Sequence, residues 1–127
     1  MTRTFTCILC PNGCEITVTH ENGVISACEG HQCKNGRKYV EQELTDPRRT
    51  IASSVLVTGG VRPLASVRLT APIPRDLIFK VMDQIKLICL PAPVEPGTVL
   101  MENIFGTGSN LITTCWVEKP NKKRNAV

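Results

Sequence analysis

Five of the seven cysteines lie within the first 33 residues, and this cluster constrains the fold more than any other feature of the chain. An odd total argues against complete disulfide pairing, and such a density in a reducing compartment is typical of metal or redox chemistry. A segment of under about 50 residues has too small a core to hold itself together, so we expect a bound metal to stabilise it. The five clustered cysteines are Cys7, Cys10, Cys14, Cys28 and Cys33.

The composition is that of an ordinary globular protein, with 42% hydrophobic and 20% charged residues in 127. Disorder, collagen-like repetition and coiled coil are therefore excluded. The character of the chain changes near Asp46-Pro47, where the cysteine-rich part ends. We predict an α+β protein with two parts: a metal-binding head over residues 1–47, and a body over residues 48–127 built from short strands and one main helix.

The head is expected to contain a β-hairpin and a short helix. Residues 15–19 alternate polar and apolar side chains, the turn residues Asn22-Gly23 follow, and residues 24–27 resume an extended pattern. A helix is expected from Asn35-Gly36 to Leu44, ended by the proline at position 47. The hairpin would carry the chain away from the first three cysteines and return it near the last two.

The body is expected to contain a second hairpin, an amphipathic helix and two further strands, followed by a mobile tail after Pro120. Cys89 and Cys115 stand apart in apolar surroundings, so we expect both to be small buried hydrophobic residues. The expected strands cover residues 51–57, 65–69, 99–104 and 112–117, and the expected helix covers residues 75–87.

Several functional classes are excluded by what the chain lacks. Its longest apolar stretches fall far short of the roughly 18 to 20 residues needed to cross a bilayer, so we expect no membrane span. The first residues lack the pattern of a secretory signal, which predicts a cytoplasmic protein. The net charge of +4 is spread along the chain, which argues against nucleic acid as a partner. No hydrolytic motif is recognisable, so we expect an accessory subunit that does not catalyse a reaction alone.

The spacing Cys7-x2-Cys10-x3-Cys14, with one distant fourth cysteine, favours a [4Fe–4S] cluster. Cys33 is the expected fourth ligand and Cys28 the alternative, because the spacing alone does not separate them. A structural zinc site built from four of the five cysteines, with His31 as a further candidate, is the first alternative. A thiol or disulfide redox site that uses Cys28 is the second. Lys34, Arg37 and Lys38 are expected near the cluster, where positive charge would favour its reduced form.

The head resembles the N-terminal [4Fe–4S] segment of the molybdopterin-dependent oxidoreductases. The resemblance covers about 35 residues and rests on the runs Cys-Ile-Leu-Cys-Pro-Asn-Gly-Cys from residue 7 and Cys-Glu-Gly-His-Gln-Cys-Lys-Asn-Gly from residue 28. It implies Cys7, Cys10, Cys14 and Cys33 as the cluster ligands. A chain of 127 residues cannot enclose a bis-pterin cofactor, so the molybdenum chemistry of those enzymes is not expected here.

Nearly the whole chain resembles a small bacterial and archaeal family of uncharacterised function. The residues that carry this resemblance are the cysteine head, Asp46-Pro47-Arg48-Arg49-Thr50, Val57-Thr58-Gly59-Gly60, Pro72-Ile73-Pro74-Arg75 and the segment 97–114. Its members are typically encoded beside FAD-dependent dehydrogenases similar to anaerobic glycerol-3-phosphate dehydrogenase. The resemblance therefore implies an iron–sulfur subunit that relays electrons to or from a flavin-dependent dehydrogenase. A zinc-stabilised protein-interaction module and a thiol redox sensor remain the alternatives.

Overall fold

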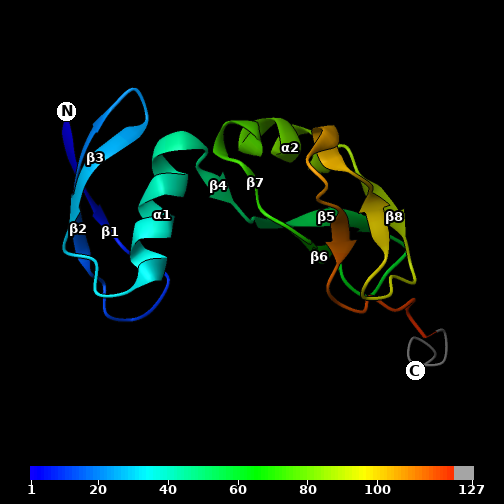
Figure 1. Cartoon of the computed structure of the whole chain (residues 1–127). Helices are drawn as coiled ribbons and strands as arrows, with labels where there is room; N and C mark the ends of the chain where they lie inside the picture. Colours follow the sequence, from blue (N-terminus) through cyan, green and yellow to red (C-terminus); the bar gives the residue numbers. More distant parts are fainter. Residues whose placement is uncertain (122–127) are drawn as a thin grey trace. The chain divides into compact units, whose positions relative to one another are not determined.

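The computed structural model describes residues 1–121, and the expected tail after Pro120 lies outside this part except for Asn121. The chain divides into two compact units, Met1–Arg48 and Arg49–Val127, whereas the sequence analysis placed the boundary after residue 47. Over the described residues the structure has ten strands in three sheets and two α-helices (Figure 1). The predicted α+β class is confirmed.

The first unit is a three-stranded antiparallel sheet followed by a helix, in the sheet order β1-β2-β3. The predicted hairpin is confirmed, and its turn residues Asn22 and Gly23 both adopt the positive φ that such tight turns require. The additional strand β1 was not predicted, because its threonine-rich sequence has little apolar alternation. The elements are β1 (Thr2–Thr6), β2 (Glu15–Glu21), β3 (Val24–Glu29) and α1 (Lys34–Thr45).

The core of the first unit is small. Strand β2 turns Ile16 and Val18 to the interior, and α1 contributes Val40. Gly36 brings the first turns of α1 close to the sheet, since a Cβ at this position would lie 3.0 Å from Cδ1 of Ile16. With Cys7, these apolar side chains make up the fully buried cluster of the unit.

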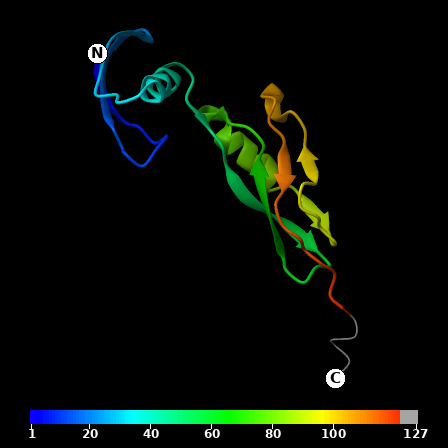
Figure 2. The ribbon, with the colours of Figure 1, turned by 60° about the horizontal axis from the view of Figure 1, so that its bottom comes forward.

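The second unit is built on a five-stranded sheet in the order β8-β5-β6-β10-β9 (Figure 2). The predicted hairpin of β5 and β6 is confirmed, with Val55 opposite Ala65 in its register. Strand β8 was not predicted; it is only three residues long and runs parallel to β5. The strands are β5 (Ala52–Thr58), β6 (Leu64–Leu69), β8 (Cys89–Pro91), β9 (Val99–Met101) and β10 (Leu111–Thr113), and two short strands, β4 (Arg48–Arg49) and β7 (Ile73–Pro74), form a separate ribbon.

The helix predicted over residues 75–87 is present in two parts, a 3₁₀ turn at Arg75–Leu77 and the α-helix α2 at Ile78–Ile85. Its buried side chains Val81 and Ile85 belong to the same apolar cluster as the inward-facing residues of β5 and β6. This helix covers one face of the sheet (Figure 1). None of the helices in residues 1–121 is both long enough and apolar enough to span a bilayer.

Three expectations for the body need correction. The strand expected over 99–104 ends at Met101, because Asn103 and Phe105 adopt left-handed backbone angles and a 3₁₀ turn occupies Ile104–Gly106. The strand expected over 112–117 covers only Leu111–Thr113, with a single further bridge from Val117 to Val94. Cys89 is exposed and Cys115 is half-buried, since β8 is a short edge strand and Cys115 follows the end of β10.

Candidate metal centre

Four cysteines line one cavity of about 180 Å³ in the first unit. They are Cys7, Cys10, Cys14 and Cys33, the four expected ligands of a [4Fe–4S] cluster. The remaining lining residues are uncharged: three have amide side chains, one is a leucine and one is a glycine. They are Asn12, Gln32, Asn35, Leu9 and Gly36. The cavity therefore offers sulfur ligands and amide groups, and its lining includes no acid, base or cation.

The loop from Cys7 to Cys14 brings three of these cysteines to the cavity. The backbone N–H of Cys7 donates a hydrogen bond to the carbonyl of Cys14 at 2.9 Å, which closes the loop at the ends of β1 and β2. Gly13 has φ +59 and permits the sharp reversal before Cys14. Cys7 is buried, Cys14 is half-buried and Cys10 is exposed, so the loop presents its sulfur ligands at graded depths below the surface.

Cys33 reaches the same cavity from the start of α1. It is the N-cap residue of that helix, with extended backbone angles of φ −148 and ψ 165. The positive end of the helix dipole favours a negatively charged ligand at this position. Gly30 allows the chain to pass from β3 to this cap: it has φ +95, and a Cβ there would lie 2.2 Å from the carbonyl oxygen of Glu15.

Cys28, the alternative fourth ligand, is not among the residues that line the cavity. It lies in β3 opposite Val18 and packs partly against the small core of the unit. Its Sγ lies 3.7 Å from Nδ1 of His31. This position favours Cys33 over Cys28 as the residue that completes the set with Cys7, Cys10 and Cys14.

The donor set around the cavity fits a [4Fe–4S] cluster. Within residues 1–121, no group of three or more His, Cys, Asp or Glu side chains is placed to hold a single metal ion. Four cysteine thiolates are also the donor set of a structural zinc site. A [4Fe–4S] cluster is held by four cysteine thiolates, each on a different iron, and the four cysteines that line the cavity supply that number and type of ligand.

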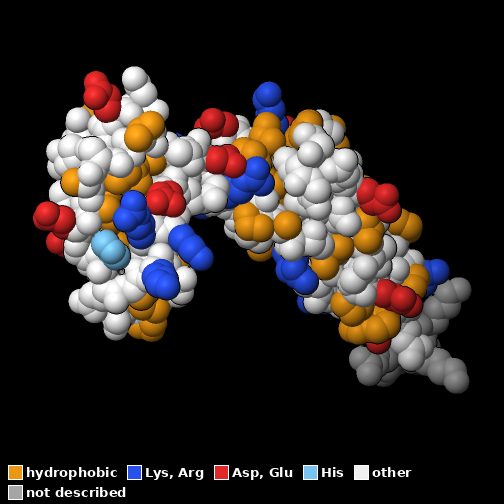
Figure 3. Space-filling view, viewed as in Figure 1, with side chains coloured by type: hydrophobic (Ala, Val, Ile, Leu, Met, Phe, Trp, Pro, Cys, Tyr) orange, Lys and Arg blue, Asp and Glu red, His pale blue; other side chains and the backbone are white. Residues whose placement is uncertain are grey.

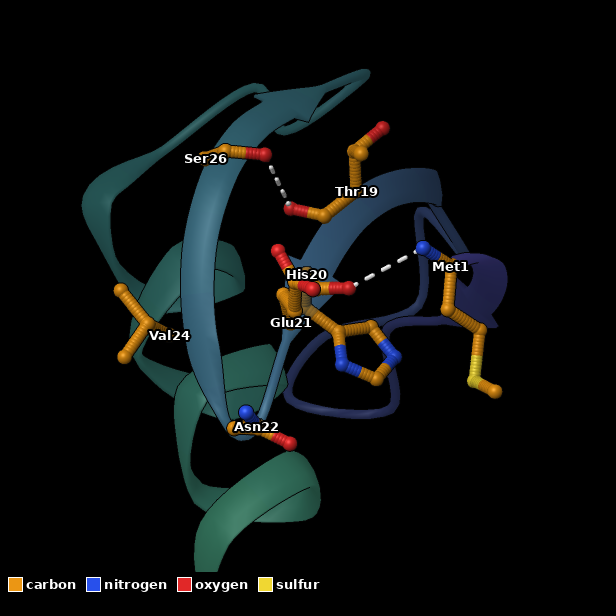
Figure 4. A pocket seen from close by; sticks show the side chains of 7 residues that line it. All are labelled: Met1, Thr19, His20, Glu21, Asn22, Val24 and Ser26. Atoms are coloured by element: carbon orange, nitrogen blue, oxygen red, sulfur yellow. Dashed lines mark hydrogen bonds between the residues drawn. The ribbon is translucent and has the colours of Figure 1, made fainter.

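A second cavity of the first unit, about 390 Å³ in volume, contains none of the expected ligands. His20 points into it beside Met1, whose amino group donates a hydrogen bond to the His20 carbonyl at 3.2 Å (Figure 4). Both ring nitrogens of His20 are shielded from solvent and have no hydrogen-bond partner in the described part of the chain. The sequence indicated only a hairpin surface at this position.

Cys115 in the second unit has a polar environment that sequence reasoning missed. Its Sγ accepts a hydrogen bond from the backbone N–H of Ser66 at 3.4 Å. A hydrogen bond from the Ser66 side chain is the main cause that lowers the pKa of Cys115, and the positive charge of Arg62 acts in the same direction, whereas burial opposes both. Because Ser66 lies 49 residues away, the sequence held no signal of this contact.

A family model described as "Protein of unknown function (DUF1667)" matches residues 34–115. The chain belongs to this family. The match begins one residue after Cys33, so it includes α1 and most of the second unit but none of the four cysteines that line the cavity. The sequence analysis predicted a family of uncharacterised function, and this match confirms that part of the prediction. A search among curated proteins found no match.

Among solved structures, the chain is similar to the NMR structure of the Clostridium perfringens protein CPE0013. The two share 20% sequence identity with a TM-score of 0.52, and the similarity covers 58% of this chain and 88% of the other. At this identity the similarity concerns the fold alone.

Proposed function

We propose that this protein is an iron–sulfur electron-transfer subunit that relays electrons to or from a flavin-dependent dehydrogenase. One observation carries the proposal: Cys7, Cys10, Cys14 and Cys33 line a single cavity, although Cys33 is 19 residues from the nearest of the other three. The resemblance to a family whose members are encoded beside FAD-dependent dehydrogenases suggests the class of partner. A cytoplasmic location is part of the same proposal.

The four cysteines would hold the cluster as thiolates, and the bound cluster would accept and donate one electron at a time. The amide groups of Asn12, Gln32 and Asn35 line the same cavity, where N–H donors to sulfur raise a reduction potential. Leu9 lines the cavity as well and excludes water from part of it, although 57% of its own surface is exposed. These residues bind and tune a redox centre.

The position of the cavity suits exchange of electrons with another protein. Cys10 and Cys33 are both exposed, so two of the four ligands lie at the surface of the unit. The neighbouring Ile8 is 69% exposed and offers apolar contact area beside the ligands. The lining lacks the acid–base groups that an enzyme needs to transform a substrate, which supports a carrier that leaves the chemistry to its partner.

The test is anaerobic purification of the full chain followed by EPR spectroscopy before and after reduction. Reduction by dithionite should produce the signal of a reduced [4Fe–4S] cluster. In a separate sample without dithionite, a photoreduced flavoprotein should produce the same signal. A chain that holds one zinc and no iron after anaerobic reconstitution would contradict the proposal and leave the zinc-stabilised interaction module. A reversible change in free thiols without any metal would instead point to the thiol redox sensor.

A further inference from the structure

One face of α1 carries a row of cationic side chains that line a groove of about 400 Å³. Lys34, Arg37, Lys38 and Glu41 are spaced at intervals of three and four residues, so they share one face of the helix. His31 from the preceding loop completes the lining. Figure 3 shows Lys and Arg side chains gathered beside a histidine on this unit.

Positive charge dominates this groove. Arg37 pairs with Glu41, with 3.2 Å between Nε and Oε1, and both side chains are about half exposed. Within residues 1–121, Lys34 and Lys38 pair with no carboxylate. Two cations four residues apart on one helix repel each other, and a negatively charged ligand would remove that cost.

The groove and the cysteine cavity share no lining residue, but the first turn of α1 contributes residues to both. Asn35 and Gly36 face the cavity, whereas Lys34 and Arg37 face the groove. The cations expected to favour the reduced form of the cluster therefore do not line its cavity. They lie next to it, where a protein bound in the groove would sit close to Cys33.

We propose that this groove docks an acidic surface of the redox partner, a patch rich in Asp and Glu side chains. The inference rests on the proposed function, because it names the partner surface that brings the other redox centre close to the cysteine cavity. Opposite charges on two proteins speed their encounter and fix the orientation in which they meet.

The small extent of the cationic patch favours an acidic protein over a nucleic acid. Residues 1–48 contain five Lys and Arg residues and six Asp and Glu residues, a formal net charge of −1. The groove is thus a local cationic patch on a slightly acidic unit. A nucleic acid requires an extended basic surface along its phosphate backbone, whereas a compact acidic patch needs only a few cations.

The first arm of the test measures binding of poly-L-glutamate and of duplex DNA to the full chain by NMR titration at low and at moderate salt. We expect poly-L-glutamate to shift the amide signals of α1, with an affinity that falls as salt rises. The double variant Lys34→Glu/Lys38→Glu should bind it about tenfold more weakly, a loss of about 1.4 kcal/mol. The matched control Lys80→Glu/Lys86→Glu makes the same charge change at exposed positions, one in α2 and one at its C-cap, and should bind within about twofold of the wild type.

The second arm measures how fast a photoreduced flavodoxin with an acidic surface reduces the iron-loaded protein. We expect the groove variant to be reduced about tenfold more slowly than the wild type and the α2 variant, with equal rates for all three under dithionite. Equal behaviour of the two double variants in both arms would overturn the docking proposal, and so would duplex DNA that binds more tightly than poly-L-glutamate. A chain that takes up no iron on anaerobic reconstitution but still binds poly-L-glutamate through α1 would overturn only the electron-transfer function.

Discussion

The two units of the chain are held together by very different amounts of apolar core. The second unit buries thirteen residues in one cluster, drawn from β5, β6, α2 and the segments after them. The first unit buries four, and one of these is Cys7, an expected metal ligand. A sheet and one helix with so few buried side chains need a further source of stability, and a metal bound by the cysteines around the cavity would provide one.

Removal of the metal should have the largest effect on stability, and only the first unit should be destabilised. When iron is removed from the loaded protein by a chelator under anaerobic conditions, we expect the amides of β1, β2 and α1 to lose protection from hydrogen exchange. Those of β5 and β6 should keep theirs, because their core contains no ligand. Hydrogen exchange with mass spectrometry checks this, and equal protection of the first unit with and without metal would contradict it.

A substitution that creates a cavity in the large core should destabilise the second unit and leave the first unit unaffected. Leu69→Ala removes a side chain with no exposed surface, so we expect the free energy of unfolding of the second unit to fall by about 3 kcal/mol. Denaturant unfolding, followed by the fluorescence of Trp116, measures it. Leu64→Ala in the same strand is the control: its side chain is 48% exposed and its loss should cost less than about 1 kcal/mol.

The iron content of the Leu69→Ala protein separates the two units further. It should equal that of the wild type, since none of the cavity ligands belongs to the second unit. A loss of iron on this substitution would show that the two units do not fold independently.

A backbone substitution inside the first unit should cost slightly less and change metal binding. Gly30→Ala combines a positive φ with a Cβ placed 2.2 Å from the Glu15 carbonyl oxygen, so we expect a loss of about 2 to 3 kcal/mol and a lower iron content. Gly59→Ala in the second unit is the matched control, because its φ is also positive, no atom lies within 4 Å of the added Cβ, and the residue lies outside the cysteine cavity. It should cost only about 1 kcal/mol. Equal iron contents in the two variants would show that the approach of Gly30 to β2 does not shape the site.

The smallest expected effect concerns Cys115, which lies outside the metal site. Ser66→Ala removes the side-chain hydrogen bond that favours the thiolate, so the pKa of Cys115 should rise toward its ordinary value. Alkylation by iodoacetamide, followed by peptide mass spectrometry, should then require a higher pH than in the wild type. Ser54→Ala, on the neighbouring strand opposite Ser66, should leave the profile unchanged. An unchanged profile in Ser66→Ala would contradict the assigned contact.

The sequence predicted both hairpins because their signals are local. Alternation along β2 and the turn at Asn22-Gly23 suffice to define the first hairpin, and the apolar positions of β5 and β6 define the second. Strand β1 and the parallel strand β8 are defined by their partners instead. Neither carries enough apolar alternation of its own to be recognised.

The candidate site shows the same division between local and non-local information. Spacing indicated Cys7, Cys10 and Cys14 as a group, and Cys33 was the expected fourth ligand, but spacing alone left Cys28 as an alternative. The register of β3 and the start of α1 favour Cys33, since Cys28 is placed opposite Val18 in the sheet while Cys33 is the N-cap residue of α1 and lines the cavity. That distinction depends on strand pairing, which the spacing of cysteines does not contain.

The most direct test of the account is the iron, acid-labile sulfide and zinc content of three proteins purified anaerobically: the wild type, Cys33→Ser and Cys28→Ser. We expect about four irons and four sulfides per chain in the wild type and in Cys28→Ser, and a marked loss of both in Cys33→Ser. One zinc and no iron in the wild type, or a loss of iron in Cys28→Ser with Cys33→Ser unaffected, would contradict it.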